Sequence, residues 1–536
     1  MNKWSNIFSD PEKIFKYSLL LFTIVFLFTR LQYFLLYPVL VLSSDSASYC
    51  AVALDLLNSD TPVFDIRTPA YPVFLFLIWL FSKSFFAVAL IQSLFTLITG
   101  YIFLFIISKT YSRYTFLFSL MLCIYISSSY FLVLEKALLT EGIFVNFLIV
   151  NAGLLIYALR KNLTSAWALY SVSIALLILI RPAALFLFGV LAILVLFFIV
   201  NRYKLKYYVS LILPLSVIIF GLCSYNYYTL RLFTITPFGE ANLSGVTILF
   251  MEPSDEYPEI VNEAINNTLD SIPRTQKNYI RNSWGISELY HTFNENFYRQ
   301  VNFTESLMRL DPALNFVAIQ PIMRMVSVDA IKKSPRSYLK FVMCNFMFFF
   351  NNQRITMNYY DQMATVFTRT VIDQKYLKEL TSGRWRMISS DLSDNEKVAD
   401  FFREEIAAQK TLKNVNVNSE GSVEIDDSVY RSIYELSEII YNTVFRNFLW
   451  IILYFVVFGL SIFKLYKSRF KNAEALIPFL LCMTFIFKAV LVSLVEVSLA
   501  RYSYTVEFVY YFSLPFLLIM LTNNKLNSNN SEEIKQ

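Results

Sequence analysis

The sequence predicts an all-α polytopic membrane protein, and three observations support this fold class. The 536 residues are 56% hydrophobic and only 16% charged, whereas about a quarter of the residues in a typical soluble domain are charged. Apolar stretches of roughly twenty residues, the length that spans a bilayer as a helix, recur along the chain. Lysine and arginine gather in alternate loops between these stretches, as expected for a multi-pass topology.

About ten apolar stretches are candidates for membrane crossings. They lie at residues 17–42, 84–107, 115–134, 142–159, 165–180, 183–200, 207–230, 444–466, 474–493 and 505–522. The stretches 165–180 and 183–200 are short and are divided by Arg181-Pro182. Residues 69–82 are too short to cross, so we expect a re-entrant or interfacial helix there.

The basic loops give the topology, because lysine and arginine mark cytoplasmic loops. With the N-terminus inside, the cytoplasmic loops carry Lys109/Arg113, Arg160/Lys161, Arg202/Lys204/Lys206, Lys464/Lys467/Arg469/Lys471 and Lys525. The chain is then an integral, multi-pass protein, which we expect in a bacterial inner membrane. The extracytoplasmic side receives the charged residues Asp45, Arg67, Glu135, Glu141, Arg181, Glu496 and Arg501.

Four regions follow from this topology. Residues 1–230 form an N-terminal transmembrane region that includes the first external loop, 43–72. Residues 231–443 form a polar, mainly helical extracytoplasmic insert, with helical spacing at 258–269, 305–308 and 426–441, and an apolar run at 338–350 that we expect along the membrane surface. Residues 444–522 are the C-terminal transmembrane helices, and 523–536 are a polar tail predicted to be disordered and cytoplasmic.

Composition excludes several classes of function. The formal charge of +6 is modest and falls in cytoplasmic loops, so no nucleic-acid binding is indicated. Five scattered cysteines form no Cys-x-x-Cys pair and no disulfide framework. His291 is the single histidine of the chain, so a histidine-rich zinc site is excluded.

The external loop 43–72 holds the first candidate site residues. Asp45 follows an apolar helix and could cap the amphipathic run 46–57, or it could act as the base that takes a proton from an attacking hydroxyl. Arg67 opens the run Arg-Thr-Pro-Ala-Tyr71-Pro72. Its guanidinium suits a phosphate diester, although an arginine beside two prolines can also be a simple helix boundary.

Charged residues near three other external turns complete the candidate set. Glu135, Lys136 and Glu141 lie in the turn LEKALLTE, where they could bind substrate or simply snorkel to the headgroups. Further along the chain, the candidates are Arg181, Glu496, Arg501 and Tyr502. The arginines could clamp a departing phosphate, or they could be interfacial anchors.

Taken in order, these elements resemble the GT-C superfamily of glycosyltransferases, and most closely its protein mannosyltransferase and aminoarabinose transferase branch. The resemblance implies transfer of a sugar from a polyprenyl-phosphate donor, with undecaprenyl as the expected carrier, to a hydroxyl of an extracytoplasmic acceptor with inversion. It assigns catalysis to Asp45 and Glu141. Phosphate binding falls to Arg67, Tyr71, Lys136, Arg181, Arg501 and Tyr502, and substrate positioning to Glu135 and Glu496.

Two departures from the family pattern stand out. There is no Asp-x-Asp, since the loop reads Asp45-Ser46-Ala47, so no metal-bound nucleotide sugar is indicated. The phosphodiester is already a competent leaving group, so no cofactor is required, although a divalent metal could assist. The large external part also precedes the last three helices instead of following them, so the identity of the acceptor does not carry over from the family.

Two other classes of function stay open at this point. An O-antigen ligase or polymerase also combines many membrane helices with a long external loop, but its use of a loop histidine would rest on His291 alone. A lipid or polysaccharide transporter predicts charges spread through the depth of the membrane and matched broken helices. The charges here gather at one face, and the sequence shows no repeat.

Overall fold

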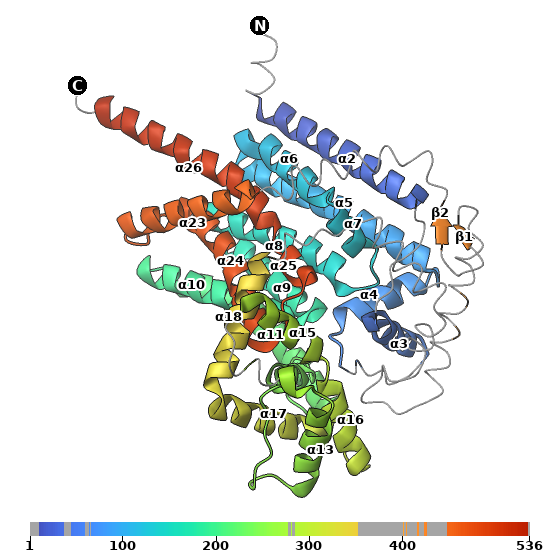
Figure 1. Ribbon diagram of the computed structural model, residues 1–536. Helices are drawn as coiled ribbons and strands as arrows, with labels where there is room; N and C mark the ends of the chain where they lie inside the picture. Colours follow the sequence, from blue (N-terminus) through green and yellow to red (C-terminus); the bar gives the residue numbers. More distant parts are fainter. Residues whose placement is uncertain are drawn as a thin grey trace.

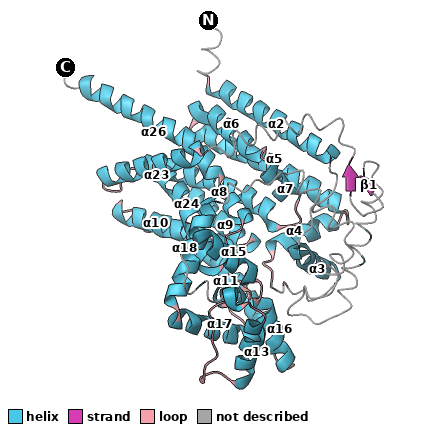
Figure 2. Cartoon of the chain, in the orientation of Figure 1, coloured by secondary structure: helices cyan, strands magenta, loops and turns pink. Residues whose placement is uncertain are grey.

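The computed structural model describes residues 10–36, 44–58, 64, 66–276, 280, 285–351, 400, 404, 415–417, 423–425 and 448–533. Within these residues the chain is almost entirely helical (Figures 1 and 2). A short antiparallel pair, β1 (Val415–Val417) and β2 (Val423–Ile425), is the exception in the described part. The predicted all-α polytopic class therefore holds, and the insert is mainly helical where it is described.

The first 230 residues form long apolar helices with shorter helices between them. The long helices are α2 (Pro11–Leu36), α5 (Phe85–Thr110), α8 (Thr140–Lys161), α9 (Thr164–Ile180) and α11 (Leu205–Leu230), and two shorter apolar helices, α6 (Thr115–Ile126) and α10 (Leu187–Val200), run among them. The shorter elements are α3 (Ser44–Asn58), α4 (Ala70–Trp79), α7 (Ser129–Lys136) and the 3-10 turns η1 (Ser112–Tyr114) and η2 (Pro182–Phe186). The last part of the chain adds α23 (Leu449–Lys467), α24 (Ala473–Val495), α25 (Ala500–Tyr504) and α26 (Phe508–Glu533).

Eight helices of the described residues are long and apolar enough to cross a membrane, or nine if the bent pair within 115–134 is one span, against the ten stretches predicted. The stretch 115–134 is broken, because Ser128 caps a new helix by accepting a hydrogen bond from the Phe131 amide, and the two halves bend by 71°. The stretch 165–180 ends at Arg181, which is extended because it precedes Pro182. Helix α4 is too short to cross, as expected for 69–82.

The ends of the long helices sort by the charges of their loops. At the end that the basic loops mark as cytoplasmic, Glu474 of α24 pairs with Arg160 of α8 and accepts a hydrogen bond from the Tyr111 hydroxyl after α5. The opposite ends of α8 and α24 carry Glu141 and Glu496. Helix ends that the sequence assigns to one face therefore meet in space.

Six further helices form a second body beyond the opposite ends, and its outer part is seen at the bottom of Figure 1, away from both termini. We call this body the external domain. It consists of α12 (Gly239–Thr247), α13 (Glu259–Asp270), α15 (Ile286–Phe297), α16 (Gln300–Leu310), α17 (Phe316–Lys333) and α18 (Pro335–Asn351). Its apolar core includes Ile66 and Val497, so two segments of the membrane region are packed into it.

Local expectations for the insert and the tail fare differently. The windows 258–269 and 305–308 lie in α13 and α16, and 338–350 lies in α18, as predicted helices. The window 426–441 lies outside the described residues. Helix α26 extends to Glu533, into the tail predicted to be disordered from residue 523. No proline or glycine follows Pro515 to stop the helix.

Candidate active site

Asp45 is held between two arginines from distant parts of the chain. It lies in the first turn of α3, with Oδ1 2.9 Å from Nη2 of Arg67 and Oδ2 3.2 Å from Nη1 of Arg501. Its side chain is 31% exposed, so a ligand can reach it. Burial opposes ionisation of this carboxyl, but the positive charges of Arg67 and Arg501 outweigh that cost, and the pKa of Asp45 is well below its ordinary value.

Arg67 is fixed by the helix that carries Asp45. Its Nε donates to Oγ of Ser48 at 2.7 Å, and its guanidinium lies 4.5 Å over the ring of Tyr49. Tyr71 packs edge-on against Tyr49 at 5.1 Å, and its hydroxyl donates to the buried Gln92. Tyr71 therefore supports the aromatic surface under Arg67, while its hydroxyl is engaged on the other side.

Glu141 joins a second pair of arginines. Its Oε1 lies 2.7 Å from Nη1 of Arg181 and 3.6 Å from Nε of Arg501, and its side chain is 2% exposed. The neighbouring Gly142 allows this placement, because a Cβ there would lie 2.8 Å from the carbonyl oxygen of Leu134. Arg501 thus touches both carboxylates, Asp45 and Glu141.

Tyr502 links the arginines to Glu496. Its hydroxyl donates to Glu496 and accepts a hydrogen bond from Nη2 of Arg501 at 3.2 Å, while Arg181 lies 4.8 Å over its ring. Burial raises the pKa of Glu496 above its ordinary value, and the hydrogen bond from Tyr502 offsets this only in part. The acids of the cluster are therefore unequal, with Asp45 the more acidic and Glu496 the less acidic.

Hydrogen bonds next to each site residue hold the segments together. The hydroxyl of Ser46 donates to the Leu138 carbonyl at 3.0 Å, which joins α3 to the turn before Glu141. The hydroxyl of Thr68 donates to the Ile180 carbonyl at 3.1 Å, which joins Arg67 to Arg181. We define the charge cluster as the seven side chains that meet here: Asp45, Arg67, Glu141, Arg181, Glu496, Arg501 and Tyr502.

Comparisons of the chain with protein-family models, curated proteins and solved structures gave no match.

Two of the residues predicted for the site belong to a separate network. Glu135 accepts hydrogen bonds from Nη2 of Arg30 at 2.8 Å and from Nε at 3.1 Å, and both side chains are almost fully buried. The hydroxyls of Ser93 and Thr96 also donate to it. Lys136 lies 4.6 Å over the ring of Phe34, with Glu135 as its electrostatic partner. Glu135 therefore braces the packing of α2, α5 and α7.

Two residues near the charge cluster were not singled out from the sequence. Lys488, in the middle of apolar α24, donates to Thr505 and lies 4.8 Å over Phe144; it feels the charges of Arg181 and Glu141. A lysine within an apolar helix is itself a signal, since such a residue is costly in a membrane. Tyr298, after α15, feels the charges of Arg501 and Asp45. No sequence pattern connects this residue of the insert to the cluster.

The cluster suits an anion better than a cation. Among the described residues, no group of three or more histidine, cysteine or acidic side chains could hold a metal ion. Arginines contact both Asp45 and Glu141, so these carboxylates are not arranged as a metal-binding set. Three partly exposed guanidiniums meet here and offer planar donors to a phosphate, which is the anion they match best.

Proposed function

We propose that the protein is an integral membrane glycosyltransferase that moves a sugar from a polyprenyl-phosphate donor to a hydroxyl acceptor on the extracytoplasmic side of a bacterial inner membrane. The observation that carries the proposal is the convergence of Arg67, Arg181 and Arg501 on Asp45 and Glu141. These residues lie next to the external domain, at the ends of membrane helices opposite the basic loops. A lipid-borne phosphate meets its aqueous partner at such a boundary.

In the proposed reaction the acceptor oxygen attacks the anomeric carbon of the donor sugar. The bond from that carbon to the phosphate oxygen breaks, and polyprenyl phosphate leaves with the electron pair. The negative charge that grows on the leaving oxygen is what Arg67, Arg181 and Arg501 would stabilise, as preorganised donors do at other charged transition states. No step in this scheme uses a metal.

Asp45 would take the proton of the acceptor hydroxyl. In the ligand-free protein its two arginines make it a weak base, because the pKa of Asp45 is lowered. A donor phosphate competes with the carboxylate for the same guanidiniums. As Arg67 and Arg501 turn to the phosphate, Asp45 loses their charge and becomes more basic. Donor binding would thereby activate the base, which limits proton uptake to complexes that hold a donor.

Glu141 would set the position of the clamp and has no direct part in proton transfer. It is almost fully buried and holds Arg181 and the Nε of Arg501. Its second role follows from Arg501, whose buried Nε has no hydrogen-bond partner within the described residues. Without the charge of Glu141, the half-buried Arg181 and Arg501 would repel each other beside Tyr502.

The decisive experiment measures release of polyprenyl phosphate. Purified protein is incubated with undecaprenyl-phosphate sugars and a cell-envelope extract as acceptor, and carrier release is followed with product formation. We expect release with at least one donor, and at least a hundredfold loss in Arg67→Ala, because one guanidinium of the clamp is removed (about 2.7 kcal/mol).

Arg160→Ala is the matched control. Arg160 is also a partly exposed arginine that is paired with one carboxylate, but it lies at the other ends of the helices. Equal losses in the two variants, or no carrier release with any donor, would overturn the transferase assignment. Movement of intact donor across vesicles by both Arg67→Ala and the unmodified protein would favour a transporter instead.

A further inference from the structure

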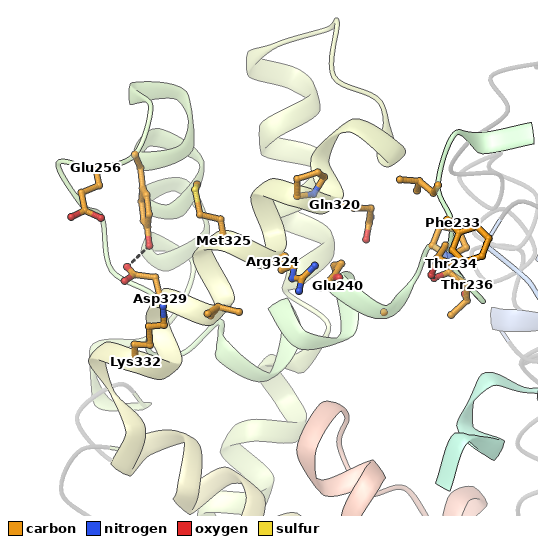
Figure 3. A pocket seen from close by; sticks show the side chains of 16 residues that line it. Phe233, Thr234, Thr236, Glu240, Glu256, Gln320, Arg324, Met325, Asp329 and Lys332 are labelled. Carbon is orange, nitrogen blue, oxygen red and sulfur yellow. Dashed lines mark hydrogen bonds between the residues drawn. The ribbon is translucent and has the colours of Figure 1, made fainter. Parts of the chain in front are cut away.

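A cavity of about 670 Å³ opens in the external domain, apart from the charge cluster (Figure 3). It lies between the segment that leaves α11, the start of α12 and one face of α17. Figure 3 shows Phe233, Thr234 and Thr236 at one end, Glu256, Asp329 and Lys332 at the other, and Gln320, Arg324 and Glu240 between them. Its volume falls in the range of about 300–1,000 Å³ typical of small-ligand sites.

The charges that line the cavity nearly cancel. Arg324 and Lys332 face the carboxylates of Glu240, Glu256 and Asp329. Asp329 is already neutralised, because Lys333 binds it at 2.8 Å and the hydroxyl of Tyr257 donates to it. A phosphate or another anion would meet these carboxylates, and a lipid chain would bury the charged groups without partners. The lining therefore favours an uncharged, strongly hydrogen-bonding ligand.

Gln320 supplies the most specific observation. It is 4% exposed, and its Nε2 donates to the Phe316 carbonyl at 3.0 Å, which fixes the amide. Its Oε1 accepts no hydrogen bond from the described residues. A buried amide oxygen without a donor is costly. This oxygen is covered in the structure, so a ligand hydroxyl or N–H reaches it after a rotation of the Gln320 side chain and then removes that cost. Figure 3 shows the side chain directed into the cavity with Arg324 and Glu240.

The apolar part of the cavity lining can pack against the flat C–H face of a ligand. The ring of Phe233 is exposed at one end, and the side chain of Met325 is exposed between the charged groups. Pro237 and Pro321 add rigid apolar surface. In the lining, this apolar surface alternates with carboxylates, a guanidinium and hydroxyls. A ligand ring with C–H groups on its faces and hydroxyls along its edge would contact both kinds of group.

We propose that this cavity binds a neutral carbohydrate chain. The two-ended arrangement suits several consecutive sugar units, with hydroxyls donating to Gln320, Glu240 and Glu256 and accepting from Arg324. A peptide would also bring N–H groups, but the described edge here is helical and offers no strand to pair with one. The balanced charge of the lining and the amide oxygen of Gln320, which lacks a donor within the described residues, favour a saccharide over a peptide.

The cavity is linked to the charge cluster by a short path. The hydroxyl of Thr236, in its wall, donates to the carbonyl of Ile66 at 3.3 Å. Ile66 is the neighbour of Arg67 and is packed in the core of the external domain. A chain bound in the cavity thus ends close to the loop that carries Asp45. That this carbohydrate is the acceptor of the transfer rests on the proposed function, whereas its binding does not.

Binding is tested on the full-length protein in detergent, without any donor. The probes are neutral hexasaccharides of glucose, mannose and N-acetylglucosamine, followed by saturation-transfer NMR and calorimetry. We expect at least one to bind with a dissociation constant of about 0.1–1 mM. Gln320→Leu should weaken it about tenfold through loss of the buried acceptor, and the exposed Arg324→Ala should weaken it severalfold with no effect on folding.

Gln300→Leu is the matched control. Gln300 is also 4% exposed in the same domain, and its Oε1 also lacks a hydrogen-bond partner within the described residues, but it does not line the cavity. Binding that survives Gln300→Leu and weakens in Gln320→Leu supports the site. No binding by any of the three probes overturns it, as does equal weakening in the two variants, or tighter binding of an acidic heparin hexasaccharide or a Gly-Ser decapeptide.

The same variants separate this proposal from the transferase proposal. Saccharide binding by a protein that releases no carrier phosphate would leave the cavity assignment standing and remove the transferase. Carrier release that is unchanged in Gln320→Leu, with binding lost, would show that the bound chain is not the acceptor.

Discussion

Replacement of Asp45 by asparagine should lower both kcat and KM, kcat by far the more. Asp45 accepts from Arg67 and Arg501 at 2.9 and 3.2 Å. Each charge-assisted bond is worth about 1.5–3 kcal/mol, and the lower figure applies because the carboxylate is partly exposed. A donor phosphate that displaces it regains most of this energy in its own bonds. We therefore expect Asp45→Asn to make the free energy of donor binding more favourable by about 1.4 kcal/mol and to lower KM about tenfold.

The same substitution removes the base, so kcat should fall by about 10²–10⁴. The assay is carrier-phosphate release at several donor concentrations, with thermal unfolding in detergent to establish that the protein is folded. Glu474→Gln is the control, because Glu474 is also a partly exposed carboxylate that is paired with an arginine, but at the other helix ends. A kcat for Asp45→Asn within tenfold of the unmodified protein refutes the role as base. A KM that rises refutes competition between carboxylate and phosphate.

Three further predictions concern the buried charges. Glu135→Gln should lower the free energy of unfolding by about 3 kcal/mol, because it leaves the buried Arg30 without a charged partner. The double variant Arg30→Met/Glu135→Leu should recover most of that loss. A loss of activity at unchanged stability would instead show that Glu135 acts in the site. Because burial raises the pKa of Glu496 in the folded state, the folded protein binds more protons than the unfolded chain, and this group loses stability as pH rises from about 4.3 through that raised value. The gain in thermal stability of Glu496→Gln over the unmodified protein should therefore be larger at about pH 8 than at about pH 4, and a pH-independent difference would contradict the assignment. Lys488→Met should raise the free energy of unfolding by about 1–3 kcal/mol, because an apolar side chain of similar length replaces a buried charge. The hydroxyl of Thr505 keeps its hydrogen bond to the Tyr502 carbonyl. A destabilised variant would show that the ammonium group is needed for the fold.

The sequence predicts the fold class and most helices because bilayer length and apolar composition leave few alternatives. It does not predict the bend of 71° at 115–134, where Ser128 caps a new helix within an apolar run, although the two halves together are still long and apolar enough for one span. Apolar composition alone does not show such a break.

For the site, charge at one face brought Asp45, Arg67, Glu141, Arg181, Glu496 and Arg501 into one hypothesis, and the structure brings all six together. The structure separates Glu135 and its neighbour Lys136 from the charge cluster, because Glu135 pairs with Arg30 of α2 and Lys136 lies over the ring of Phe34. The direction of a side chain near the end of a short bent helix depends on packing partners far along the chain. The position of Tyr298 near the charge cluster could not be predicted from the sequence for the same reason.

The pairing of Asp45 with Arg501 also bears on how the protein is made. These two residues are 456 positions apart, and the second opens the last membrane helix. In the topology that the sequence predicts, the loop with Asp45 and Arg67 crosses the membrane early in synthesis, while Arg501 is still untranslated. A growing chain therefore has no complete charge cluster until its last helix is inserted. Any activity of the site is delayed until assembly is finished, and truncation before residue 501 would leave the helices without the clamp.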